Sequence, residues 1–285
     1  MSDPEPQRRR ICRPHGSFCV EMKYDKIVEA KFIERENRFV ARVKLPDGEI
    51  SRVHVKNTGR CRELLLPGAD VYLEDHADRM GNRKLRYSLI AVRKTAEGGG
   101  QILINMDSQA PNKVAGEALA DGQIRLPGFE DNADRSDNAG QSGNADQACA
   151  PVPLLIKPET RFGDSRFDFY VEHVDAEGEK RRAFIEVKGV TLEEGGHARF
   201  PDAPTERGVK HINELIWAHE EGYDAYIIFV VQMEGMKDVS PNYETHPQFG
   251  EALAKAQKAG VKILAYDCLV MPDRLEVKGP VSFKF

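Results

Sequence analysis

The stretch SRFDFYVEHVDAEGEKRRAFIEVKGVTL, residues 165–192, decides the fold class of the C-terminal half of the chain. Phe, Val, Ile and Tyr dominate two runs separated by a charged and glycine-containing segment, a pattern typical of a β-hairpin. Asp168 interrupts the first run, and Glu186 and Lys188 close the second. Charged residues are rarely buried without a partner, so their place on these strands requires an explanation.

Downstream of this hairpin, strand patterns alternate with helix patterns. Apolar residues recur at helical spacing in the first predicted helix, at Val209, Ile212, Leu215 and Ile216. A hairpin followed by alternating helices and strands predicts an α/β domain with a mixed sheet covered by helices, over residues 154–285. The predicted strands are 166–174, 181–188, 225–231 and 262–267, and the predicted helices are 205–221 and 245–259.

The N-terminal half, in contrast, shows almost only strand patterns. The turn PDGE at 46–49 lies between two alternating apolar runs and indicates a hairpin. About five short strands with one longer connection, NTGRCRELLLPG, predict an all-β domain over residues 23–107, a small closed barrel resembling the OB-fold. Such barrels often bind oligomers across one face, although a fold alone does not define a function.

Two segments differ from both domains. Residues 1–22 are expected to form a disordered extension, and 108–153 a connecting helix, near 109–120, followed by a low-complexity acidic loop. The loop, at 130–153, is rich in Asn, Asp, Gly, Ser and Ala and has almost no large apolar residue. We therefore do not expect it to contribute to a hydrophobic core.

Composition narrows the class of protein. The chain has 285 residues and a formal net charge of −5. It therefore lacks the overall positive charge that is typical of nucleic-acid-binding proteins. Residues 21–105 nevertheless hold 17 Lys and Arg against 13 Asp and Glu, whereas 151–285 hold 17 against 23. The five cysteines are scattered, which argues against a disulfide framework or structural zinc site and for a reducing compartment. With neither a secretory signal pattern nor an apolar run of membrane-spanning length, we expect a cytoplasmic protein without a membrane partner.

The charged residues of the hairpin suggest a metal site. Glu186 and Lys188 are two apart and face one side of their strand, and hairpin pairing sets Asp168 near Glu186. A hard cation, Mg²⁺ or Mn²⁺, relieves the repulsion between two carboxylates, and Glu159 is a further candidate ligand. Lys188 is then placed to assist a water or to offset charge in a transition state. The alternative is a structural ion-pair network.

Two other segments are candidates for nucleic-acid contact. The predicted helix at 205–221 begins with a plausible cap and several cations, an arrangement suited to a phosphate: Thr205, Arg207, Lys210 and His211. A loop between barrel strands offers a second set, Asn57, Thr58, Arg60 and Arg62, for which the alternative is a capped turn. For Trp217, the sole tryptophan, a core or interface role is expected rather than base stacking.

Taken in order, the motifs NTGRCRELLLPG, ETRFGDSRFDF, IEVKGVTL, FPDAPTERGVKHINEL and ILAY resemble those of the sugar fermentation stimulation protein A family, over about 25–129 and 154–267. The resemblance implies an OB-like N-terminal domain, a C-terminal domain similar to PD-(D/E)XK nucleases, and DNA binding. It matches Asp168, Glu186 and Lys188 to the nuclease signature and Glu159 to a frequent fourth acidic position. The first twenty residues and the stretch 130–153 are longer than the family needs and leave the site residues in place.

Two functional hypotheses remain. The first is a Mg²⁺- or Mn²⁺-dependent nuclease that cleaves a phosphodiester, with Asp168 and Glu186 holding the metal, Glu159 as a possible third ligand and Lys188 assisting the attack. The second is a regulatory protein that binds DNA on a nuclease-like scaffold without turnover. DNA is the expected partner, with RNA as an alternative, and the sequence is compatible with a homo-oligomer.

Overall fold

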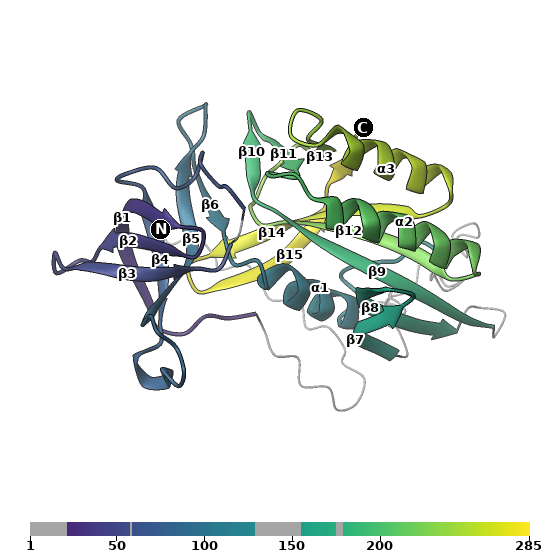
Figure 1. Ribbon diagram of the computed structural model, residues 1–285, viewed down its shortest axis with the longest axis horizontal. Helices are drawn as coiled ribbons and strands as arrows, with labels where there is room; N and C mark the ends of the chain where they lie inside the picture. Colours follow the sequence, from purple (N-terminus) through teal and green to yellow (C-terminus); the bar gives the residue numbers. More distant parts are fainter. Residues whose placement is uncertain (1–21, 58, 129–154, 175–178) are drawn as a thin grey trace, which may run out of the picture.

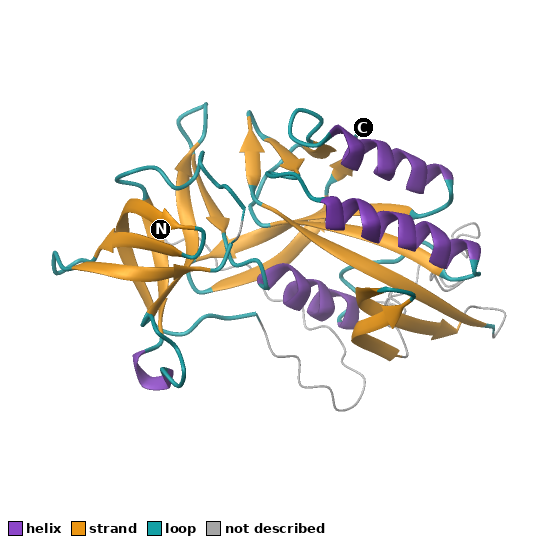
Figure 2. Ribbon diagram, in the orientation of Figure 1, coloured by secondary structure: helices purple, strands orange, loops and turns teal. Residues whose placement is uncertain are grey.

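The computed structural model describes residues 22–57, 59–128, 155–174 and 179–285. A β-barrel lies at one end of the molecule and a helix-covered sheet at the other (Figure 1), and strands make up much of both parts (Figure 2). The expected N-terminal extension and acidic loop fall almost wholly outside the described residues. Met22, the last residue of the expected extension, is described, and it is buried.

The N-terminal part has the OB-like fold that the sequence predicts. Strand β1 pairs with β2 and β4, β2 pairs with β3, and β4 pairs with β5. A parallel pairing of β3 with β5 closes these five strands into a barrel, and β6 continues the sheet beyond β5. The strands are β1 (Ile27–Asn37), β2 (Val40–Lys44), β3 (Ile50–Val55), β4 (Asp70–Asp75), β5 (Tyr87–Thr95) and β6 (Gln101–Asn105), with the 3-10 helix η1 (Ala77–Arg79) after β4.

The C-terminal part is a mixed six-stranded sheet in the order β15-β14-β12-β9-β8-β7. The central strand β12 runs parallel to β9 and β14, while antiparallel partners extend the sheet on either side. All four predicted strands are present, and β7 and β15 are additional. The bounds are β7 (Leu155–Phe162), β8 (Ser165–Val174), β9 (Lys180–Val190), β12 (Asp224–Val231), β14 (Lys262–Met271) and β15 (Arg274–Pro280).

Helices cover both faces of this sheet (Figure 1), as its apolar central strand requires. Helix α1 (Ala110–Ala120) packs on one face of the sheet, where Ile185 of β9 and Ile228 of β12 belong to the same buried cluster. Helices α2 (Glu206–Glu220) and α3 (Pro247–Lys258) pack on the other, with Phe229 and Phe167. A second small sheet, β10-β11-β13-β16, is formed by β10 (Leu192–Glu194), β11 (His197–Phe200), β13 (Asp238–Pro241) and β16 (Ser282–Phe283). None of the described helices is long and apolar enough to span a membrane.

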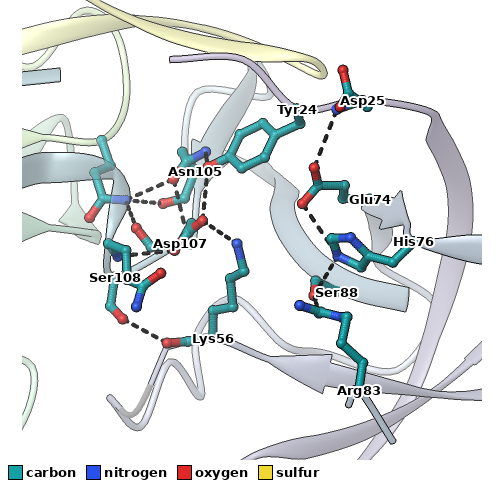
Figure 3. Close-up of polar contacts among 12 residues, drawn as sticks. Tyr24, Asp25, Lys56, Glu74, His76, Arg83, Ser88, Asn105, Asp107 and Ser108 are labelled. Carbon is teal, nitrogen blue, oxygen red and sulfur yellow. Dashed lines mark hydrogen bonds and ion pairs between the residues drawn. The ribbon is translucent and has the colours of Figure 1, made fainter. Parts of the chain in front are cut away.

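Buried polar contacts fix the barrel to the sheet. The side chain of Gln232, which follows β12, donates to the carbonyls of Asn105 and Asp107. The Asp107 carboxylate in turn accepts from Lys56 at 2.7 Å and from the Tyr24 hydroxyl (Figure 3). Because buried polar groups need partners, this network specifies one arrangement of the two parts.

Candidate active site

The centre of the site is a pair of carboxylates on neighbouring strands. The β8–β9 pairing ends at Phe169 opposite Ile185, and the same register carried one step further places Asp168 opposite Glu186. At this step the backbone N–H of Val187 donates to the Asp168 carboxylate at 2.7 Å. The two strands therefore stop pairing where the carboxylates face each other. There the Asp168 carboxylate, and not a backbone carbonyl of β8, accepts the hydrogen bond from the Val187 amide.

Asp168 is held by a residue that the sequence analysis did not single out. The side-chain amide of Asn112, in the first turn of α1, donates to Asp168 at 2.6 Å. The segment APNK at 110–113 predicted only a helix start, because contact between α1 and the sheet depends on tertiary packing. Together with the Val187 amide, Asn112 occupies both oxygens of the carboxylate and fixes its orientation.

Glu186 is buried, and its two oxygens have different surroundings. Lys188 and the His211 ring both contact Oε1, each at 2.5 Å. The other oxygen, Oε2, is buried and has no hydrogen-bond partner among the described residues. A buried acceptor without a partner carries a desolvation cost, so Oε2 is the atom of this site that most needs a ligand.

The pKa values of the two carboxyl groups are shifted in opposite directions. Burial, followed by the negative charge of Glu186, raises the pKa of Asp168 from 3.8 to about 6. Burial also opposes ionisation of Glu186, but the hydrogen bonds from His211 and Lys188 and the positive charge of Lys188 outweigh it and lower the pKa of Glu186 below its ordinary value. The cluster therefore holds one firmly ionised carboxylate and one that titrates near neutrality.

His211 lies inside the site rather than on the surface. Its Nδ1 contacts Glu186, and its Nε2 accepts from the Arg207 guanidinium at 3.2 Å. These two contacts fit a neutral ring protonated at Nδ1. The side chain is directed inward because His211 lies on the buried face of α2, where Gly208, Ile212 and Leu215 are also buried.

The carboxylates line a cavity of about 550 Å³. The remaining predicted members of its wall come from α2 and β7: Thr205, Arg207, Lys210 and Glu159. Two further cations from the β7–β8 hairpin, Arg161 and Arg166, were not predicted and also line it. With Lys188, five Lys and Arg side chains line the cavity, and four carboxylates line it as well, because Asp164 joins Glu159, Asp168 and Glu186. Such a mixed wall suits an anionic ligand together with a cation.

Glu159 stands apart from the carboxylate pair. It lies across from Asp168 in the β7–β8 register, but its backbone has a φ of +52° and its side chain is 62% exposed. Its carboxylate pairs with Arg166 at 3.3 Å. Within the described residues, no group of three or more His, Cys, Asp and Glu is arranged to hold a metal ion. The predicted role of Glu159 as a metal ligand thus stays a prediction.

Thr205 and the barrel loop approach the same surface. The Thr205 hydroxyl caps α2 by accepting from the Gly208 amide at 3.1 Å, which confirms the predicted cap. In the loop, the Asn57 side chain accepts from the Gly59 amide. This contact is the capped turn that was expected from the sequence as the alternative to nucleic-acid contact. A Cβ at Gly59 would overlap the Asp202 carboxylate, so the loop touches the segment that leads into α2.

Among the described residues of the predicted loop set, Asn57, Arg60 and Arg62 do not line the cavity. Arg60 and Arg62 are exposed, and Thr58 lies outside the described residues. The Arg35 guanidinium holds the loop by donating to the carbonyls of Asn57, Gly59 and Arg60. The loop is thus a fixed feature beside the cavity and not part of its wall.

Trp217 is 45% exposed, so it does not lie in the core, which was one of the two positions expected from the sequence, the other being an interface. The centroid of its ring lies 4.7 Å from the centroid of the Phe162 ring. The signal for exposure was present in the sequence, because Trp217 falls outside the apolar stripe made by Ile212, Leu215 and Ile216.

Comparison with known proteins agrees with this architecture. Residues 33–104 match the family model of the SfsA N-terminal OB domain, and 109–274 match that of the sugar fermentation stimulation protein RE domain. Sugar fermentation stimulation protein homologs of Desulfitobacterium hafniense (strain DSM 10664 / DCB-2) and Clostridium beijerinckii (strain ATCC 51743 / NCIMB 8052) are 47% and 46% identical. Each alignment covers 92% of this chain, and 98% and 99% of the relative.

A solved structure supports the fold over nearly the whole chain. The structure of Pyrococcus furiosus SfsA in complex with Ca²⁺ matches with a TM-score of 0.71 and 26% identity, covering 93% of this chain and 98% of that one. The sequence match and the shared architecture lead to the same conclusion: this chain belongs to the sugar fermentation stimulation protein family.

Proposed function

We propose that this protein is a divalent-metal-dependent nuclease that hydrolyses a phosphodiester bond of DNA. The observation that carries the proposal is the opposed pair Asp168 and Glu186, at the wall of a cavity that five Lys and Arg side chains also line. The buried Oε2 of Glu186 has no hydrogen-bond partner within the described part of the chain. Carboxylates alone would repel a polyanion, and cations alone would only bind it. Their combination in one cavity suits a reaction at phosphate.

The donor set fits a hard cation. Asp168 and Glu186 would hold Mg²⁺ or Mn²⁺, since Mg²⁺ commonly takes one or two carboxylates and completes its shell with water and phosphate oxygens. Burial and the charge of Glu186 disfavour the ionised form of Asp168, and a bound cation would offset that cost. The related Pyrococcus furiosus SfsA forms a complex with Ca²⁺, which is also a hard divalent cation, and this supports a cation of that class. When bound, such an ion neutralises phosphate charge and makes water more acidic.

The residues of the chain then have distinct roles. Lys188 contacts Glu186 at 2.5 Å and is partly buried, so its ammonium is placed to offset charge that develops on the phosphate. His211 and Asn112 keep the two carboxylates in position and ionised. Arg207 and Lys210 of α2, with Arg161 and Arg166 of the hairpin, are the phosphate contacts. The loop with Asn57, Thr58, Arg60 and Arg62 would extend this contact along the strand.

The test is cleavage of labelled single- and double-stranded DNA and RNA in Mg²⁺, Mn²⁺ or EDTA. The variants Asp168→Ala and Lys188→Ala should lose cleavage but keep DNA binding. Glu172→Ala is the matched control, because Glu172 lies on the same strand β8, pairs with Lys180 and does not line the cavity. Binding without cleavage in any metal would contradict the nuclease and favour the regulatory DNA-binding protein.

A further inference from the structure

Trp217 lies against the β7–β8 turn, whose next residues line the cavity, and it is unusually open for its size. It is the sole tryptophan of the chain and is 45% exposed, whereas its helical neighbours Leu215, Ile216 and Ala218 are buried. Single exposed apolar residues are common and by themselves indicate nothing. What separates Trp217 from that background is how firmly it is held and what lies beside it.

The indole is held in place from several directions. The Phe162 ring packs against it at 4.7 Å, and Phe162 in turn contacts Phe184 and Tyr223. The indole N–H donates to the Glu221 carboxylate at 3.3 Å. A Cβ at Gly163 would lie 2.5 Å from the ring, so the β7–β8 turn fits closely against it. A large aromatic surface is thus preorganised, with much of it open to solvent.

The same turn and helix continue into the proposed active site. Asp164 and Ser165, which follow Gly163 directly, line the cavity. On α2, Lys210 precedes Trp217 by seven residues, which is two turns and about 10 Å along the same helix face. Glu214, between them, pairs with Lys210 at 3.5 Å. A strand whose phosphate is bound at Lys210 would therefore reach Trp217 about three nucleotides away, at about 3.4 Å per stacked nucleotide.

We propose that Trp217 is a stacking platform for an unpaired nucleobase, so that the substrate is single-stranded where it leaves the cavity toward the end of α2. This inference rests on the proposed function. Base stacking on an aromatic side chain needs an open base face, which a base inside a duplex does not offer. Cations along one strand and an aromatic platform beyond them are the two features of a single-strand groove.

The sole tryptophan makes the test direct. Asp168→Ala protein in Mg²⁺ is titrated with oligothymidylates of two to ten nucleotides and with a blunt DNA hairpin, while tryptophan fluorescence is recorded. We expect quenching by single strands of four or more nucleotides, and little change with the blunt hairpin. Unchanged fluorescence at saturating single-stranded DNA would overturn the platform.

A binding assay with labelled oligothymidylate adds a second readout. Trp217→Leu should weaken binding roughly 5- to 150-fold, and Trp217→Phe, which keeps a ring, should recover most of it. Tyr243→Leu is the control, because Tyr243 is 43% exposed and does not line the cavity. Equal affinity in wild type and Trp217→Leu would refute the platform while cleavage still supports the nuclease. Neither binding nor cleavage of any nucleic acid would refute both proposals.

Discussion

Replacing Asp168 by asparagine should stabilise the metal-free protein at neutral and alkaline pH. Burial and the nearby charge of Glu186 raise the pKa of Asp168 to about 6 in the folded chain, against 3.8 as the ordinary value. Because the folded-state pKa is the higher one, the favourable contribution of Asp168 is complete below 3.8 and is lost as the pH rises through 6. A neutral amide of the same shape avoids that loss: its oxygen can accept from the Val187 amide, and its NH₂ group can donate to the Asn112 side chain once that amide flips.

The size of the effect follows from the two pKa values. A difference from 3.8 to about 6 corresponds to about 3 kcal/mol at pH 8, at roughly 1.4 kcal/mol per pKa unit. The same relation gives a destabilisation of the folded state by Asp168 of only about 1 kcal/mol at pH 4.5. We therefore expect Asp168→Asn to raise the melting temperature by about 5–10 °C at pH 8 and much less at pH 4.5.

The assay is thermal unfolding of wild type and Asp168→Asn at both pH values, in EDTA and in Mg²⁺. Because a cation that binds only the folded state adds stability, Mg²⁺ should raise the melting temperature of wild type at pH 8 and narrow its gap to the variant. An equal or lower melting temperature of the variant at pH 8, or the same gain at both pH values, would refute the reasoning. Glu172→Gln, on the same strand, should show neither effect.

Three further changes test the surroundings of the site. Asn112→Ala removes a hydrogen bond to ionised Asp168, so the pKa of Asp168 should rise further and the acid limb of the cleavage pH profile should move to higher pH. His211→Ala should raise the Mg²⁺ concentration for half-maximal cleavage about 10- to 100-fold, as for other residues that orient metal ligands. Gly59→Ala should lower stability by about 1–3 kcal/mol in urea unfolding, because two side chains must move, while Gly100→Ala, with open space around it, should change it by less than about 0.5 kcal/mol.

The carboxylate pair could be predicted from sequence because it depends on local geometry alone. A strand has a period of two, so Glu186 and Lys188 share a face, and the hairpin register then brings Asp168 across from Glu186. The strands and helices of the α/β part were predictable for the same reason, since their apolar spacing is a local property. Closure of the barrel by β3 and β5 also follows the expected OB-like pattern.

What could not be predicted depends on contacts between distant segments. Asn112 reaches Asp168 across 56 positions, and no periodicity links them. The inward direction of His211 requires α2 to lie over β9, and the packing of the Trp217 ring against Gly163 depends on where the β7–β8 turn lies. The raised pKa of Asp168 is likewise a property of burial in the assembled site, which no single segment contains.

The same dependence explains why the barrel and the site belong to one packed unit. The Asp107 carboxylate, just after β6, binds Lys56, just after β3, and it also accepts from the backbone amide of Gln109 at the start of α1. Three residues later, Asn112 holds Asp168. Because α1 is rigid and its first turn is fixed at both ends, the barrel sets the position of the amide that orients the aspartate. A site whose aspartate is destabilised by its own charge needs such support, since a free side chain would turn toward solvent and leave the metal position.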